Sequence, residues 1–216
     1  MARPLYEQHR PRTWGDVVGQ DKAVQRLRAI EQRSGFGGKA FFLSGASGTG
    51  KTSLARIVAK TVASEYATFE LDASEVTPGD VRDWQRQFRG RPIGSPGWAV
   101  LLNEVHGLRK DTIRALLVAL EAIPEFVVWV FTTTAEGQAS LFEDQIDASP
   151  LLSRCIEVAL SRRDLSMDFA CHARKIAQAA GLDGKPIECY LRLAKDCHNN
   201  LRQILQRIEL GDMANG

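Results

Sequence analysis

The sequence predicts an α/β fold, in which helices cover both faces of a parallel sheet, followed by a small module made only of helices. Two observations predict the sheet. Short apolar runs alternate with amphipathic segments up to about residue 160, as happens when each strand is followed by a helix. These runs are apolar on both faces, which is typical of strands buried between two helical layers. A third observation predicts the helical module, because no strand-like run follows Ser161. We therefore expect a first domain over residues 1–160 and a helical domain over residues 161–216.

Local patterns place the individual elements. Continuous apolar runs predict strands over residues 40–43, 98–102 and 126–131. Alternation predicts another strand over residues 67–71, and a last short strand is expected over residues 156–160. Apolar residues at helical spacing predict helices over residues 21–33, 52–64 and 111–122, and three more over 164–180, 186–197 and 200–210. A further helix begins after Thr77, a good N-cap residue, with Pro78 at its first position, and carries Val81, Trp84 and Phe88. The first fifteen or so residues are expected to form an extended arm, and residues 136–149 a long polar surface loop.

Composition narrows the class of protein. A chain of 216 residues with 44% apolar and 25% charged residues is typical of a soluble globular protein. No apolar run approaches the roughly 20 residues that span a bilayer, and the N-terminus lacks the apolar core of a secretory signal. We therefore expect a cytoplasmic protein without a membrane partner. The net charge of +2 permits nucleic-acid binding through local clusters but does not require it.

The cysteines do not predict a metal site. Cys155, Cys171, Cys189 and Cys197 form no C-x-x-C pair and show no zinc-ligand spacing. Although Cys171 and Cys197 each precede a histidine, adjacent residues on a helix point in different directions. We expect reduced, structural thiols.

One motif predicts nucleotide binding. Residues 45–52 fit the phosphate-binding loop G-x-x-x-x-G-K-[ST], with an apolar strand before it and a helical pattern after it. Such a turn directs backbone N–H groups and the positive end of a helix dipole at a polyphosphate. Lys51 would reach the β- and γ-phosphates of ATP, and the Thr52 hydroxyl would ligate Mg²⁺. The residues expected to bind the nucleotide here are Gly45, Ala46, Ser47, Gly48, Thr49, Gly50, Lys51, Thr52 and Ser53.

A second motif predicts the hydrolytic residues. An ATPase of this kind needs a second strand that ends in acids, one for the water shell of Mg²⁺ and one that activates the attacking water. The candidate strand ends in Asn103 and Glu104. Glu104 takes the place of the activating carboxylate, although a solvated acid at the end of a strand is the alternative. Asn103 stands where an aspartate is expected. It keeps one acceptor oxygen but lacks the charge that Mg²⁺ prefers, so hydrolysis could be slower.

Several segments together resemble one family. Residues 6–20 (YEQHRPRTWGDVVGQ) are similar to the opening of clamp-loader ATPases of the AAA+ class. Residues 70–74 (ELDAS), 103–106 (NEVH), 115–121 (ALLVALE), 152–155 (LSRC) and 199–202 (NNLR) resemble later motifs of that family, in the same order. The resemblance covers nearly the whole chain and is specific to replication factor C and the bacterial gamma/tau and delta-prime subunits. It implies the AAA+ phosphate-loop fold with a three-helix lid, and a subunit that works in an oligomer with other AAA+ subunits, DNA and a sliding clamp.

The resemblance also implies roles for single residues. Arg154 would be an arginine finger that reaches the nucleotide of a neighbouring subunit. Thr133, chosen among three consecutive threonines, would position the attacking water. Arg202 would touch the γ-phosphate from the lid. The adenine pocket would be walled by Arg10, Pro11, Val17 and Val18. By themselves, Arg154 is also consistent with a surface arginine and Arg202 with the solvated face of a helix.

Basic residues are the candidates for DNA contacts. Arg82, Arg86 and Arg89 have the spacing of one helical face, with Arg91 close behind. Arg109, Lys110 and Arg114 cluster at the start of the next helix. In DNA-tracking members of the family, equivalent helix starts line the inside of a spiral, and such a stripe would bind backbone phosphates without reading sequence. A solvated charged face is the alternative.

Three functions therefore remain open. The first is an ATPase that resembles a clamp-loader subunit and couples ATP binding and hydrolysis to assembly on DNA during replication. The second is an ATP-gated structural subunit that hydrolyses poorly because of Asn103. The third is another AAA+ protein that remodels DNA, such as a helicase loader or a transposition regulator.

The chain also lacks the family's usual helical collar domain and the bacterial zinc module, so we expect either a fragment or assembly through the ATPase domains.

Overall fold

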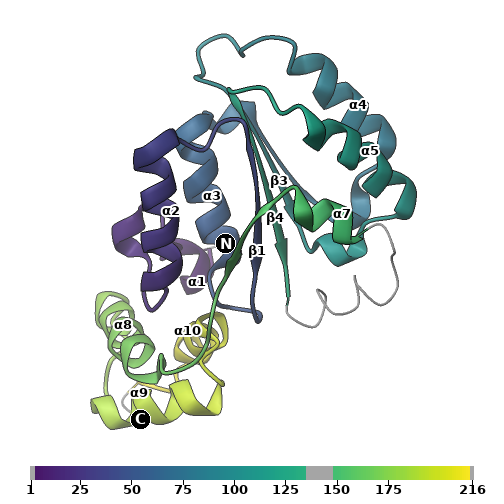
Figure 1. The fold of residues 1–216 in the computed structure, drawn as a ribbon. Coiled ribbons are helices and arrows are strands. Elements are labelled where there is room, and N and C mark those ends of the chain that lie inside the picture. The colour runs from purple at the N-terminus through teal and green to yellow at the C-terminus, as the bar shows by residue number, and fades with distance from the viewer. Residues whose placement is uncertain (1–2, 135–147, 215–216) are drawn as a thin grey trace. The chain divides into compact units, whose positions relative to one another are not determined.

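A five-stranded, wholly parallel sheet forms the centre of the larger of two units in the computed structural model, which describes residues 3–134 and 148–214 (Figure 1). Its strand order is β2-β3-β4-β1-β5. The strands are β1 Lys39–Ser44, β2 Thr68–Asp72, β3 Trp98–Asn103, β4 Val127–Thr133 and β5 Ile156–Ala159. Because all strands are parallel, the residues that follow them gather at one edge of the sheet. The predicted α/β class is confirmed.

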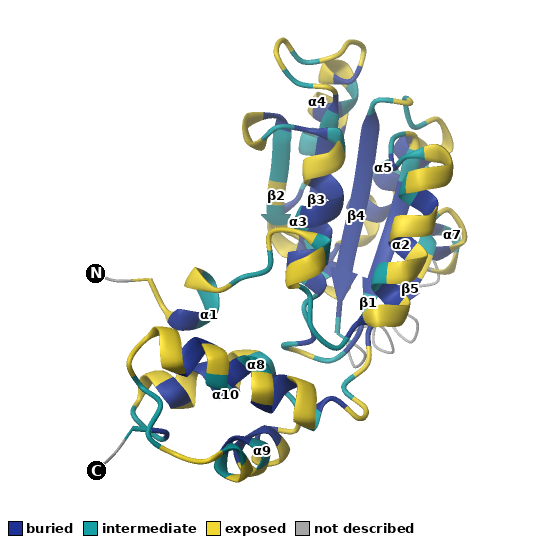
Figure 2. Cartoon of the chain, turned by 90° about the vertical axis from the view of Figure 1, so that its left-hand side faces the viewer, coloured by how far each residue is buried: buried dark blue, intermediate teal, exposed yellow. Residues whose placement is uncertain are grey.

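Helices cover both faces of this sheet. Figure 1 shows α2 and α3 on one face and α4, α5 and α7 on the other. Their bounds are α2 Asp21–Ser34, α3 Lys51–Val62, α4 Pro78–Gln87, α5 Lys110–Glu121 and α7 Ala148–Ser153, with short 3₁₀ helices at Glu65–Ala67, Ala73–Glu75 and Val105–Gly107. Most residues of β1, β3 and β4 are buried (Figure 2), as expected for strands between two helical layers.

An aromatic cluster fills the layer beneath α4. Trp129 of β4 packs edge-on against both Trp84 and Phe88, with ring centroids 5.8 and 6.0 Å apart. Trp98 stacks on Phe69 at 5.7 Å. Rings of this size dominate core energetics, so the cluster holds α4 on strands β2, β3 and β4.

The second unit, called here the helical unit, is a separate cluster of helices. It comprises residues 3–24, 46–50 and 160–214, whereas the sheet unit comprises residues 25–45, 51–134 and 148–159. Its helices are α1 Leu5–Gln8, α8 Ser166–Ala179, α9 Ile187–Asp196 and α10 Leu201–Glu209, with a 3₁₀ helix at Trp14–Asp16. Each long helix buries one apolar face, as Figure 2 shows for α8 and α10. The N-terminal residues therefore cluster with the C-terminal helices, whereas the sequence predicts them in the first domain.

A group of hydrogen bonds around Asp183, called here the polar lock, fixes one end of the helical unit. The buried Tyr190 donates a hydrogen bond from its hydroxyl to Asp183 Oδ1 at 2.9 Å. Burial and this carboxylate raise the pKa of the tyrosine. Gln178 and Arg174 donate to Asp183 Oδ2 at 2.9 and 3.3 Å, and these bonds hold the pKa of the aspartate below its usual value. The lock ties the start of α9 to the end of α8.

The predicted extended arm at the N-terminus is wrong in part. Residues Leu5–Gln8 form the short helix α1, in which the N–H groups of Glu7 and Gln8 donate to the Pro4 carbonyl. Proline is compatible with the start of a helix, and Pro11 restricts only the residue before it. Leu5 is buried in the core of the helical unit, so tertiary packing stabilises a turn that local sequence does not favour.

Two other elements differ from the sequence prediction. Helix α4 ends at Gln87, so Arg89 lies two residues beyond it and the predicted single helical face with Arg82 and Arg86 is wrong.

Helix α7 was not predicted at all. It is held by the buried side chains of Leu151 and Leu152. The predicted surface loop at 136–149 falls almost wholly outside the described residues. Within those residues, each helix is too short or too polar to cross a bilayer.

Candidate functional site

The phosphate-loop motif joins β1 to α3, as its sequence context requires. Three of its glycines have positive φ angles, 153° at Gly45, 77° at Gly48 and 98° at Gly50, which L side chains rarely adopt. Helix α3 begins at Lys51, so the N–H groups of its first turn have no partner within the helix. Lys51 is only 6% exposed, and its ammonium donates to the Gly45 carbonyl at 2.8 Å. The loop thus combines a helix N-terminus with the buried cation that a polyphosphate needs.

Gly48 also meets the lid helix within the helical unit. A Cβ at this position would lie 1.9 Å from Asn200 Oδ1. Asn200 caps α10, since its Oδ1 accepts from the Gln203 N–H at 3.3 Å. The phosphate loop therefore lies against the N-terminus of α10, whose first turn carries Arg202.

This close approach leads to a stability prediction. The Gly48→Ala variant is expected to lose about 2–3 kcal/mol, because alanine adds strain at positive φ and displaces the Asn200 cap. Gly50→Ala is the matched control. Its φ is equally unsuited to alanine, but a Cβ there meets nothing within 4 Å. Urea unfolding of both variants measures the difference, and equal losses would contradict a specific contact with Asn200.

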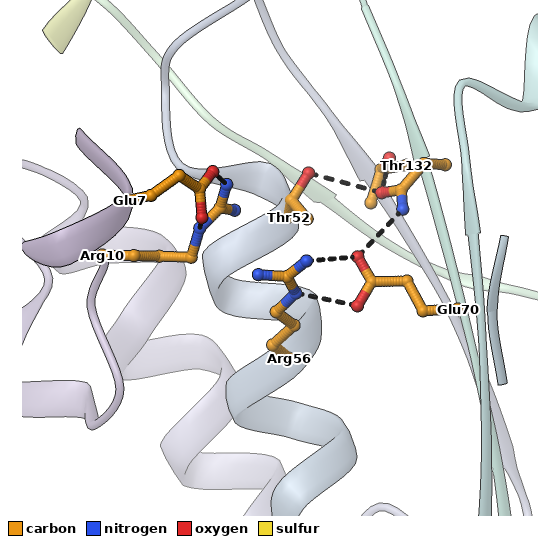
Figure 3. Close-up of polar contacts among 7 residues, drawn as sticks. Glu7, Arg10, Thr52, Arg56, Glu70 and Thr132 are labelled. Carbon is orange, nitrogen blue, oxygen red and sulfur yellow. Dashed lines mark hydrogen bonds and ion pairs between the residues drawn. The ribbon is translucent and has the colours of Figure 1, made fainter. Parts of the chain in front are cut away.

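Thr52 and Asn103 face each other at the edge where the strands end. The Thr52 hydroxyl donates to Asn103 Oδ1 at 3.3 Å, and the Thr132 hydroxyl donates to the same oxygen at 3.0 Å (Figure 3). The amide of Asn103 donates in turn to Glu70 Oε1 at 3.3 Å. Arg56 of α3 forms two hydrogen bonds with this carboxylate, at 2.8 and 2.9 Å. Thr52 and Asn103 are thus brought together as the sequence predicts.

Glu104 follows β3 in a strained conformation. Its φ and ψ are both 54°, in the left-handed region that costs a non-glycine residue about 1 kcal/mol. Its Oε2 is buried and has no hydrogen-bond partner among the described residues. The imidazole of His106 is close by, with its Nδ1 3.5 Å from that oxygen. His106 Nδ1 also lies 3.4 Å from the hydroxyl of Thr133, the last residue of β4. Glu104 and Thr133 therefore share one neighbour, and Glu104 keeps a free acceptor.

Arg154 lies at the opposite edge of the sheet, where the strands begin. It precedes β5, donates to the Pro150 carbonyl at 3.0 Å and pairs with Glu121 at 3.0 Å. An open pocket of about 350 Å³ adjoins it, lined by Gly38, Lys39, Ala40, Leu120, Glu121, Ala122, Ile123, Arg154 and Ile156. Strands of this length run about 20 Å, so Arg154 cannot reach Asn103, Glu104 or Thr133 of its own chain. Beside it, burial raises the pKa of the Cys155 thiol to about 12, which makes this thiol unreactive.

The predicted adenine and lid residues belong to the helical unit. Arg10 is ion-paired with Glu7 (Figure 3). Val18 packs against the core of the unit, whereas Pro11 and Val17 are half-buried. Arg202 is exposed, and its guanidinium lies over the Tyr6 ring at 5.6 Å. Their roles toward a nucleotide stay predictions.

The basic residues predicted to contact DNA are exposed, but several already have acidic neighbours. Arg86 pairs with Asp83 at 2.9 Å and Arg109 with Asp111 at 3.8 Å. Arg91 pairs with Glu125 at 3.3 Å. Arg82 and Arg89 are also exposed, as are Lys110 and Arg114 of α5. A DNA phosphate would have to compete with these acids for three of the cations.

The residues fit a magnesium nucleotide rather than a metal held by the protein alone. In the described part of the chain, no three or more His, Cys, Asp and Glu side chains gather as metal ligands. All four cysteines are free, in line with the predicted thiols. The polar oxygens that do converge are those of Thr52 and Asn103. They lie beside the phosphate loop and beside Glu104, whose Oε2 has no hydrogen-bond partner among the described residues. This set suits Mg²⁺ that retains phosphate and water ligands.

Some site residues were not predicted. Glu70, Arg56, Thr132, His106 and Asn200 all touch predicted site residues, but no role for them followed from the sequence. Glu70 and His106 stand inside motifs that carry the family resemblance. Their neighbours depend on strand order and register, with Asp72 paired to Asn103 between β2 and β3. The sequence signal that could have singled out Glu70 is its charged side chain within the predicted strand at 67–71.

Comparisons with known proteins agree with this geometry. Residues 41–159 match the family described as "ATPase family associated with various cellular activities (AAA)". The chain is 28% identical over 237 residues to the DNA polymerase III subunit tau/gamma of Haemophilus influenzae, covering 96% of this chain and 33% of that protein. It is 32% identical over 161 residues to the replication factor C small subunit of Methanosphaera stadtmanae, covering 72% of this chain and 47% of that protein. The chain therefore spans about a third to a half of these relatives.

A solved structure gives the same fold. The RuvB Holliday junction branch migration motor of Thermotoga maritima matches with a TM-score of 0.72 at 21% identity, covering 93% of this chain and 64% of that chain. At this identity the similarity shows the fold alone.

Proposed function

The chain belongs to the ATPase family associated with various cellular activities (AAA), and from this premise we propose that it binds ATP at Gly45–Thr52 and hydrolyses it. The observation that carries the proposal is the buried Lys51, which begins α3 directly after three glycines with positive φ. A buried ammonium would gain strongly from phosphate oxygens. Glu104 follows β3, and its Oε2 has no hydrogen-bond partner among the described residues. An available carboxylate oxygen at this place supports hydrolysis rather than binding alone.

Each residue would have a distinct task in the reaction. Lys51 and the backbone N–H groups of the loop bind the β- and γ-phosphates. Thr52 would hold Mg²⁺ directly and Asn103 would hold it through water, and the bound ion would supply positive charge beside the phosphate oxygens. The Glu104 carboxylate orients the attacking water and accepts its proton while the hydroxyl adds to the γ-phosphorus and ADP leaves. Thr133 donates to or accepts from the same water, and His106 holds Glu104 and Thr133 at a common position.

Assembly would complete the site. Arg154 lies at the edge of the sheet opposite Asn103 and Glu104, which favours a role in the nucleotide site of a neighbouring subunit. We propose that the chain works, like the clamp-loader proteins it resembles, in an oligomer of AAA+ subunits. The exposed Arg82, Lys110 and Arg114 would then contact DNA, and a sliding clamp would be the protein partner.

A second function is favoured by Asn103. A neutral side chain at this position gives the metal less charge than an aspartate would, which suits a subunit that binds ATP and assembles but hydrolyses it slowly. Steady-state turnover of the wild-type oligomer separates the two. Turnover that falls in Glu104→Gln supports the ATPase, and its absence at saturating ATP supports the ATP-gated subunit.

Lys51→Ala tests the shared premise. We expect affinity for a fluorescent ATP analogue to fall roughly 30-fold or more, because the phosphates lose a buried cation. Lys60→Ala is the matched control, since Lys60 is exposed on the same helix α3. Equilibrium titration with each variant measures binding of the analogue. Sedimentation with and without ATP and DNA measures assembly. Undiminished affinity in Lys51→Ala would reject nucleotide binding at this loop.

A further inference from the structure

We propose that Glu70, held by Arg56, orients the side chain of Asn103, so that its carbonyl oxygen faces Thr52 and an asparagine can serve at the metal side of the nucleotide site. The inference rests on the proposed function, because it assigns Glu70 a positioning role toward Mg²⁺. It accounts for the departure at residue 103 from the aspartate that such sites usually carry. All of the residues involved lie in the sheet unit.

The first step concerns the two ends of an amide. A primary amide has an acceptor oxygen and a donor nitrogen on nearly identical arms, so only its neighbours decide which arm points where. On one side of Asn103 are the hydroxyls of Thr52 and Thr132, at 3.3 and 3.0 Å. A hydroxyl both donates and accepts, so these two groups tolerate either orientation.

The second step is the carboxylate on the other side. Glu70 Oε1 lies 3.3 Å from Asn103 Nδ2. An ionised carboxylate only accepts, so it requires the nitrogen to face it and repels the carbonyl oxygen. Among the three neighbours, Glu70 alone can therefore determine the orientation of the amide. The carbonyl oxygen then points at Thr52, where a metal or its water would find an acceptor rather than a donor.

The third step is what holds Glu70 in place. Arg56 binds both of its oxygens, at 2.8 and 2.9 Å, in the two-pronged geometry that fixes a carboxylate (Figure 3). Arg56 lies one helical turn after Thr52 on α3, so the chain Thr52–Asn103–Glu70–Arg56 starts and ends on the same helix. Position 103 and Glu70 are thus matched. An aspartate at 103 would bring a second carboxylate against Glu70, where it could not donate the hydrogen bond that the Asn103 amide donates.

The test separates metal binding from nucleotide binding. Binding of a fluorescent ATP analogue is titrated with Mg²⁺ in wild type, Glu70→Ala, Glu70→Gln and the control Glu65→Ala, an exposed acid before β2. We expect the half-saturating Mg²⁺ concentration to rise about 10-fold in Glu70→Ala, as for other residues that orient a metal ligand. The amide of Glu70→Gln both donates and accepts, so it no longer fixes the orientation of Asn103, and the half-saturating Mg²⁺ concentration should rise in this variant as well. Affinity for the analogue in EDTA should be equal in all four proteins, which a general structural defect would not allow.

A second arm needs no nucleotide. In EDTA, Asn103→Asp is expected to lower the melting temperature, and adding Glu70→Gln to it should restore most of the loss, because the double variant again places one acid beside one amide. If Glu70→Gln leaves the Asn103→Asp loss unchanged, or if Glu70→Ala has the Mg²⁺ response of wild type, the inference is overturned. If wild type and Lys51→Ala bind the analogue equally weakly with and without Mg²⁺, the proposed function fails instead, and the metal role of Glu70 fails with it.

Discussion

Replacing Arg154 with alanine is expected to lower the rate of ATP hydrolysis about 10³-fold while leaving affinity for ATP unchanged. The guanidinium would stabilise charge that develops on the γ-phosphoryl group of a neighbouring subunit, and fingers of this kind contribute 10³–10⁵ in rate by order of magnitude. In the single chain it pairs with Glu121 and lies at the far edge of the sheet from Glu104. It can therefore contribute nothing to its own nucleotide site.

A mixing experiment tests action between subunits. Arg154→Ala keeps a complete phosphate loop, and Lys51→Ala keeps a complete finger, so a mixture of the two inactive proteins should regain turnover at interfaces where the intact halves meet. Steady-state phosphate release over a range of mixing ratios measures this. Arg207→Ala, which removes an exposed arginine paired with Asp212 at 2.6 Å, controls for loss of a surface ion pair. Mixtures that remain inactive, while both variants still assemble, would contradict a finger acting between copies of this chain.

Replacing Glu104 with glutamine should lower turnover 10²- to 10⁴-fold by order of magnitude, because the variant keeps the size of the side chain but cannot accept a proton. Glutamine must adopt the same left-handed backbone, so the strain at φ 54° is common to both proteins and cancels in the comparison. Single-turnover hydrolysis at saturating ATP measures the chemical step directly.

Binding supplies the control for Glu104→Gln. Affinity for an ATP analogue should match wild type, and Glu209→Gln, an exposed acid on α10, should match wild type in both assays. Turnover unchanged in Glu104→Gln would remove this residue from the reaction and leave the free oxygen at the end of β3 without a role.

The sheet and its phosphate loop could be predicted because their signals are local. Uninterrupted apolar segments such as β3 and β4 predict by themselves that the strands are buried. The phosphate loop is predicted from glycines and a lysine at fixed spacing. Helix α1 could not be predicted in the same way, because it depends on Leu5 packing against helices almost 200 residues away in sequence. The same holds for α7, where packing of two leucines outweighs a proline in the first turns.

The metal side of the site shows the same division. Thr52 and Asn103 could be predicted from motifs, since Thr52 follows the loop after β1 and Asn103 ends β3, and the ends of these strands meet at one edge. Glu70 could not, because its contact with Asn103 requires that β2 be the neighbour of β3, in the register that pairs Leu71 with Leu102. An order of strands is a property of the whole sheet and has no signature in any one segment. Asn103, which by itself suggests a weakened site, acquires a partner only in three dimensions.

The separation of Arg154 from Glu104 across the sheet has a consequence for symmetry. When the finger of one copy enters the nucleotide site of the next and the contact is not returned, the two copies use different surfaces and the contact is heterologous. Each added copy then presents the same free surface as the one before it. Growth ends only when the rotation per step closes a ring or another protein occupies the terminal surface, and otherwise it continues as a helical filament.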